Sequence, residues 1–198
     1  VKRDCNGDHF NIPIGRCYTA VILQSNDIST LRVRNQDPYL QHIDIHSNDV
    51  SQLDGLENYG SLQTLIVTDN KIRNLSMQGI ASNLKVLDAS GNDITSLFGR
   101  SNGYSSYSSF PNLKVLVARN NDVSNFNGLS QNCPHLQFLD LRDNDLGQNV
   151  FDELASLQHL THVNLCNNDI TSVNEDLIRF AQNCSPSLVH LNLASNDI

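Results

Sequence analysis

The chain has 198 residues, of which 39% are hydrophobic and 6% aromatic, which suits a folded core of aliphatic side chains. Its formal net charge of −8 at pH 7 argues against nucleic acid as a partner, because the phosphates would be repelled. No apolar run approaches the roughly 18 residues that a membrane span requires, so we expect no transmembrane helix.

The chain begins with a segment that does not fit the repeats after it, VKRDCNGDHFNIPIGRC. We expect residues 1–17 to form an N-terminal cap, because the first coil of a solenoid exposes an apolar edge that needs a polar cover. A disulfide between Cys5 and Cys17 would close this cap and stabilise it by about 3 kcal/mol. Two unpaired thiols in a reduced compartment are the alternative.

From residue 18 onward the spacing L-x-x-L-x-L-x-x-N-x-L recurs eight times. In the segment NLKVLDASGNDITSL its positions are Leu84, Leu87, Ala89, Asn92 and Ile94. This spacing is typical of a repeat in which a short strand turns at an asparagine and the chain returns over a convex surface. The eight asparagines are Asn26, Asn48, Asn70, Asn92, Asn121, Asn144, Asn168 and Asn196.

These motifs resemble the leucine-rich repeat family, and the resemblance covers residues 18–198. It implies an α/β right-handed solenoid, or horseshoe, with a concave parallel β-sheet and convex 3₁₀ or helical segments. The first four asparagines follow one another at 22-residue intervals, which leaves about ten residues for each return path and favours extended or 3₁₀ structure. These repeats are similar to the short-period class, which includes a regulatory subunit of protein phosphatase 1.

Later repeats lengthen. An insertion, GRSNGYSSYSSF, separates Leu97 from Pro111, and its composition predicts an exposed loop. Tyr104 and Tyr107 in this loop are candidate contacts for a partner, because such residues are common in adaptable binding loops. A solvated spacer is the alternative.

Two later return paths predict helices. Phe151, Leu154 and Leu157 have helical spacing, and Ser172 to Glu175 form a capping-box pattern before the segment DLIRFAQNC. The sequence stops at Ile198, inside a repeat and without a polar capping segment. We therefore expect the natural protein to continue, with self-association through this edge as the alternative.

The eight asparagines are expected to turn inward and satisfy backbone groups of the adjacent coil. Aspartate follows seven of them, the exception being Lys71, so we predict an acidic row along one rim. Carboxylates bind calcium, but aspartate also favours tight turns for its own reasons, and we favour the second interpretation.

Alternation along each strand places the intervening side chains on the concave face. Three apolar residues there form one expected column, joined by two more, and two arginines stack beside it with two aspartates nearby. An apolar patch rimmed by charges is typical of a protein-binding surface, whereas a simple preference of β-branched residues for strands is the alternative. The predicted binding residues are Ile66, Val86, Asp88, Val115, Val117, Arg119, Phe138, Asp140 and Arg142.

Histidines occur on the same face, but we predict neither a metal site nor a cofactor. His42 and His46 lie about 13 Å apart along an extended strand, too far to share one ion. His162 and His190 occupy equivalent positions in adjacent repeats and can approach each other, yet zinc would need further ligands. The sequence also contains no nucleophile elbow, phosphate-binding loop, zinc-protease motif or dinucleotide fingerprint, so we predict that the protein is not an enzyme.

The function implied by the resemblance is recognition of a protein ligand. An extracellular or cell-surface ectodomain is favoured by the expected Cys5–Cys17 cap and by glycosylation sequons at Asn74 and Asn183. An intracellular scaffold or regulatory subunit, similar to phosphatase regulators or axonemal proteins, is the alternative. A structural assembly unit is the third hypothesis. Three further cysteines favour a cytoplasmic setting: Cys133, Cys166 and Cys184.

Overall fold

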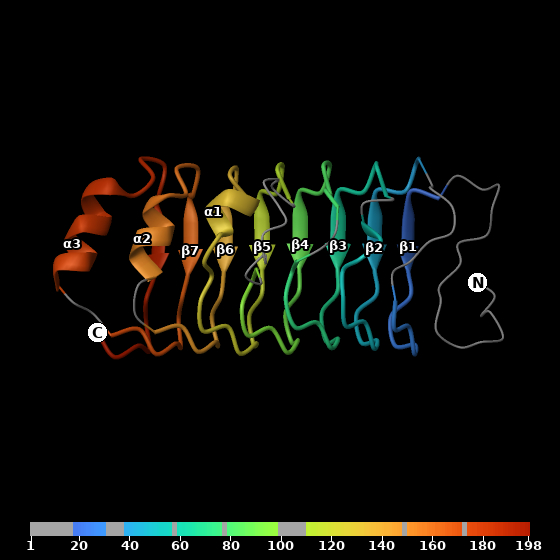
Figure 1. Ribbon diagram of the computed structural model, residues 1–198, viewed down its shortest axis with the longest axis horizontal. Helices are drawn as coiled ribbons and strands as arrows, with labels where there is room; N and C mark the ends of the chain where they lie inside the picture. The colour runs from blue at the N-terminus through green and yellow to red at the C-terminus, as the bar shows by residue number, and fades with distance from the viewer. Residues whose placement is uncertain are drawn as a thin grey trace.

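The computed structural model describes residues 18–30, 38–56, 59–76, 79–98, 110–147, 150–171 and 174–198. Strands and helices follow one another along a single elongated stack of coils (Figure 1). Their order is β1 (Ala20–Ile22), β2 (His42–Asp44), β3 (Thr64–Ile66), β4 (Val86–Asp88), β5 (Val115–Val117), α1 (Leu129–Asn132), β6 (Phe138–Asp140), α2 (Val150–Ala155), β7 (His162–Asn164), α3 (Asn174–Asn183) and β8 (His190–Asn192).

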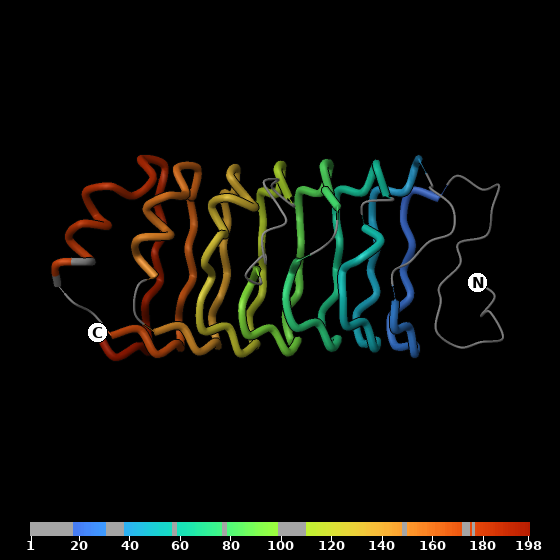
Figure 2. The backbone as a smooth tube through the Cα atoms, viewed as in Figure 1, coloured from blue at the N-terminus to red at the C-terminus, as the bar shows by residue number. Residues whose placement is uncertain are grey.

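The eight strands form one parallel sheet in which spatial order equals sequence order, β1 to β8. Equivalent residues of successive repeats pair directly, from Ala20 with His42 at one end to Asn164 with Asn192 at the other. Figure 2 shows each coil of the backbone lying beside the next one along the long axis. The architecture confirms the predicted leucine-rich repeat solenoid.

The return paths differ between the two halves, as the repeat lengths predicted. From β1 to β5 the described return segments contain no α-helix, whereas α1, α2 and α3 follow β5. The helices α2 and α3 pack against each other through Phe151 and Phe180, whose ring centroids are 5.4 Å apart. Two details differ from expectation. The helix α2 ends at Ala155, before Leu157, and the single helical turn α1 was not predicted from the sequence.

The core lies between the sheet and the return paths. The middle residue of each strand points into it, and Leu65, Leu87 and Leu116 are fully buried. Burying such a side chain contributes about 1.5–3 kcal/mol. Exposed apolar residues occur at the last coil, where Val189 is 78% exposed and Ile198 55%.

The turn after each strand passes through one residue in the left-handed backbone region. This residue immediately precedes the asparagine in all eight repeats: Ser25, Ser47, Asp69, Gly91, Asn120, Asp143, Asn167 and Ser195. Asparagine, aspartate and glycine tolerate this conformation best, which accounts for five of the eight. No helix in the described part of the chain has the length and apolarity to cross a membrane.

Candidate functional site

Three columns of side chains run across the outward side of the sheet, which we call the sheet face. The strand register places the first strand residues in one column and the third strand residues in a second. The residues two positions past each strand form the third column, since Asn120 N–H donates to the carbonyl of Arg142 at 3.1 Å. Members of a column belong to neighbouring coils, about 4.8 Å apart.

The first column contains the apolar patch, which we define as Val86, Val115 and Phe138. The three residues are register partners in β4, β5 and β6, and each is partly buried by its neighbours. Ile66 and Val117 lie in the second column, where Asp88 separates them. They therefore flank the patch rather than extend its column.

Aromatic rings continue the first column beyond the patch. Phe138 stacks on His162 with ring centroids 6.1 Å apart and 29° between the planes. His162 in turn stacks on His190 at 5.8 Å and 27°. The sequence predicted that the two histidines can approach each other, but the stacking of Phe138 on His162 was not predicted. The signal for it is that all three rings hold the same repeat position.

The second column alternates between apolar and acidic side chains from β1 to β6 and ends in two asparagines. From β1 to β8 it contains Ile22, Asp44, Ile66, Asp88, Val117, Asp140, Asn164 and Asn192. In its aspartate and asparagine members the Oδ1 atom accepts the backbone N–H two residues later, as when Arg142 N–H donates to Asp140 at 3.2 Å. Asp88 accepts from both the N–H and the hydroxyl of Ser90, at 3.1 and 2.6 Å. These carboxylates thus hold the turn as well as facing outward.

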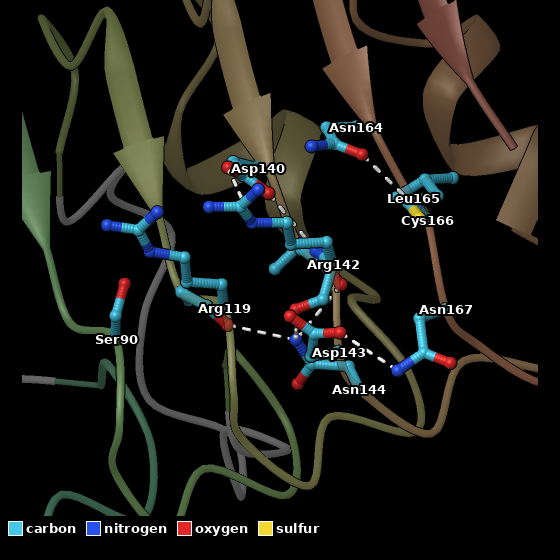
Figure 3. A network of polar contacts seen from close by, with 12 residues as sticks. Ser90, Arg119, Asp140, Arg142, Asp143, Asn144, Asn164, Leu165, Cys166 and Asn167 are labelled. Atoms are coloured by element: carbon cyan, nitrogen blue, oxygen red, sulfur yellow. Dashed lines mark hydrogen bonds and ion pairs between the residues drawn. The ribbon is translucent and has the colours of Figure 1, made fainter. Parts of the chain in front are cut away.

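Two arginines occupy the third column in neighbouring coils. Figure 3 shows Arg119 and Arg142 with their side chains extending over the sheet, and Asp140 beside the guanidinium of Arg142. The Nε atom of Arg142 lies 3.6 Å from Oδ2 of Asp140, which is an ion pair but too long for a hydrogen bond. Among the described residues, this Nε is the buried side-chain polar atom that has no hydrogen-bond partner.

The asparagines fasten each coil to the one before it. The amide of Asn92 donates to the carbonyls of Val67, Ala89 and Ser90 at 2.9, 2.9 and 3.2 Å, and its oxygen accepts the N–H of Ile72 at 2.9 Å. The same four contacts recur at Asn48, Asn70, Asn121, Asn144, Asn168 and Asn196. Asn26 bonds the carbonyls of its own turn, at Leu23 and Gln24.

On the acidic rim, the single lysine lies against an aspartate. Nζ of Lys71 is 2.6 Å from Oδ1 of Asp49, and this hydrogen bond and the charge of Asp49 raise the pKa of Lys71 above its ordinary value. In the described part of the chain, no group of three or more histidine, cysteine, aspartate or glutamate residues is arranged to hold a metal ion.

The remaining candidates are scattered. Cys5, Cys17, Tyr104 and Tyr107 lie outside the described residues. Asn183 is exposed at the end of α3, and Asn74 is half-buried with its Oδ1 accepting the N–H of Ser76 at 3.0 Å.

The three later cysteines are free thiols: Cys133, Cys166 and Cys184. Cys133 is fully buried, and burial raises its pKa, so its thiol stays protonated. Cys166 and Cys184 are partly exposed.

Comparison with known proteins supports the fold. A family model described as Leucine Rich repeat matches residues 132–149 and 184–198. No curated protein matches the chain. Among solved structures, the plant peptide hormone receptor RGFR1 in complex with RGF2 is similar over 90% of this chain, with 21% identity and a TM-score of 0.57. The chain spans 28% of the length of that receptor.

Two bacterial structures also match. Internalin C2 from Listeria monocytogenes is 24% identical over 77% of this chain and 70% of its own, with a TM-score of 0.48. An internalin, inlF, from the same species is 16% identical over 90% of this chain and 61% of its own, with a TM-score of 0.39. At these identities the likeness to the receptor shows a shared fold.

Proposed function

We propose that this leucine-rich repeat protein is a binding module that recognises a protein partner on its sheet face. The observation that carries the proposal is the apolar patch in the central coils, with Arg119 and Arg142 two columns away. Apolar side chains that share one surface with an aromatic residue and arginines are the usual anchors of protein interfaces.

The backbone holds these anchors in fixed positions before any partner arrives. Val86, Val115 and Phe138 come from register-paired strands, and buried asparagines join their coils. A surface ordered in this way loses little conformational entropy on binding, so more of the contact energy is available for affinity.

For the setting, we propose an extracellular or cell-surface recognition domain. The two sequons support it, and Asn183 is accessible at the surface. RGFR1 is by its name a peptide hormone receptor, and a peptide or protein ligand is the partner class we propose here. An intracellular scaffold or regulatory subunit is the second candidate, because three free thiols suit a reducing compartment.

Intact mass of the protein from its natural source separates the two settings. Free thiols are alkylated under denaturing, non-reducing conditions before the measurement. Three alkylated cysteines with glycan mass support the extracellular proposal, because Cys5 and Cys17 would then be paired. Five alkylated cysteines and no glycan refute it and favour the intracellular scaffold.

The binding proposal is tested with a triple variant, Val115→Thr, Phe138→Ser and Arg142→Glu, used as bait beside the wild-type chain in extracts of its source. We expect partners captured by the wild type to be lost, while the melting temperature changes by a few degrees at most, because all three side chains are partly exposed. The matched control is Ile178→Ser with Arg73→Glu, since Ile178 is 58% exposed on α3, away from the sheet face. If the triple variant still captured these partners, the proposal would be refuted, and the return paths or the segment with Tyr104 and Tyr107 would become the candidate binding sites.

A further inference from the structure

We infer that the sheet face binds an extended acidic segment of its partner, in which carboxylates flank an apolar centre. This inference rests on the proposed function and deepens it. Four of the seven lysines and arginines among the described residues lie just before or just after the strands that carry the apolar patch: Lys85, Lys114, Arg119 and Arg142. We call this group the basic band.

The basic band has two ends. Lys85 and Lys114 precede β4 and β5 and lie in neighbouring coils, because Lys114 N–H donates to the carbonyl of Lys85 at 2.9 Å. Arg119 and Arg142 follow β5 and β6 and are neighbours in the same sense. Each end thus presents two like charges on backbones about 5 Å apart. An anion bound between them would offset their mutual repulsion.

The acidic residues within the band do not cancel it. Asp88 and Asp140 are the carboxylates of the same three strands, and both are engaged with their own turns. Four cations and three carboxylates, counting the exposed Asp143 beside the arginines, leave a local charge of +1, in a chain whose formal net charge is −8. In the described part of the chain, Lys85, Lys114 and Arg119 form no ion pair, although Nζ of Lys85 donates to Oε1 of Gln63 at 3.0 Å. Arg142 pairs with Asp140 through its buried Nε.

The spacing of the band indicates the shape of the ligand. Lys114 and Arg119 are five residues apart, about 16 Å along an extended chain. Val115 and Val117 lie between them, with Phe138 in the next strand. An extended segment lying along β5 would therefore place acidic residues at both ends and apolar side chains in the middle.

A carboxylate fits this surface better than a phosphate does. Asp140 and the exposed Asp143 lie near the arginines (Figure 3), and their charges repel a dianion more strongly than a monoanion.

The test uses a displayed library of random twelve-residue peptides, selected on the immobilised chain. We expect selected peptides to carry aspartate or glutamate on both sides of an apolar centre. Synthetic copies of these peptides, labelled with fluorescein, are then titrated by fluorescence polarisation. Reversing either end, with Arg119→Glu and Arg142→Glu or with Lys85→Glu and Lys114→Glu, should weaken binding on the order of tenfold or more. Raising NaCl from about 50 to about 500 mM should weaken it as well.

The control reverses two arginines away from the sheet face, Arg73→Glu and Arg179→Glu, and should leave affinity within about twofold. Charge-neutral variants, Lys114→Gln and Arg119→Gln, keep the test valid if a reversed pair fails to fold. The inference would be overturned if the selected peptides were neutral or basic and bound the charge-reversed variants normally. If the same peptides failed to bind the variant that combines Val115→Thr with Phe138→Ser, the proposed function would stay intact. Peptides indifferent to both sets of variants, or no selected peptide at all, would overturn both.

Discussion

Replacing Asn92 with alanine should destabilise the solenoid far more than the loss of one surface amide. Four backbone groups are bonded to this side chain, but they do not all lose their only partner. Ala89 also accepts from Asn121, at 3.1 Å, and Ser90 accepts the N–H of Asp69 at 2.9 Å. Val67 also accepts from the amide of Asn70, at 3.2 Å. The N–H of Ile72 has no other hydrogen bond that the structure describes, and Ile72 is fully buried.

The magnitude follows from this one group. A buried backbone group left without a partner costs about 1–3 kcal/mol, so Asn92→Ala should destabilise the chain by about that amount. Urea unfolding followed by circular dichroism measures the change, and amide exchange at Ile72 reports it locally, because that N–H is bonded to Asn92 alone.

The matched control is Asn112→Ala. Asn112 is exposed and donates to the carbonyl of Ser82 at 2.7 Å, so water can replace its bond. We expect a change of about 0.5 kcal/mol or less for it. Equal destabilisation by the two variants would refute the argument that the buried asparagines satisfy otherwise unpaired backbone groups.

Two further predictions concern a turn and a thiol. Gly91→Val should destabilise the chain by about 1–3 kcal/mol in urea unfolding, because φ is +64° there and an added Cβ would lie against Oδ1 of Asp69. Gly91→Asn should cost less, because asparagine tolerates the left-handed backbone region better than valine does. Equal costs for the two variants would contradict the argument from backbone conformation. Alkylation of the folded chain should label Cys166 and Cys184 but not Cys133, because burial of Cys133 raises the pKa of its thiol, and peptide mass spectrometry identifies the labelled residues. Rapid labelling of Cys133 would contradict this prediction and show that its coil opens readily.

Much of the fold was predictable because one period governs it. The spacing of Leu84, Leu87 and Asn92 assigns each residue to the core or the turn, and parallel pairing then follows from stacking identical units. The helices α2 and α3 were predictable from spacing and capping residues. The end of α2 at Ala155 was not, because helix ends depend on how the next turn packs.

The site was predictable only as a set of columns. Register placed Val86, Val115 and Phe138 together, as their repeat positions indicated. The spacing does not report local hydrogen bonds, however, so the engagement of Asp88 and Asp140 with their own turns was missed. An Asp or Asn three residues before a left-handed turn position, as Asp88 is before Gly91, is the sequence signal for such a side-chain-to-backbone bond.

In the second column the side-chain chemistry repeats every two coils from β1 to β6, although the backbone repeats every one. Asp44, Asp88 and Asp140 are each two coils from the next, roughly 10 Å, which is close to the screening length at physiological salt. Deleting the coil that contains β3 would set Asp44 directly beside Asp88, at about half that distance and largely unscreened. The chain should therefore tolerate shortening by pairs of coils better than by single ones, so its unit for engineering is the pair.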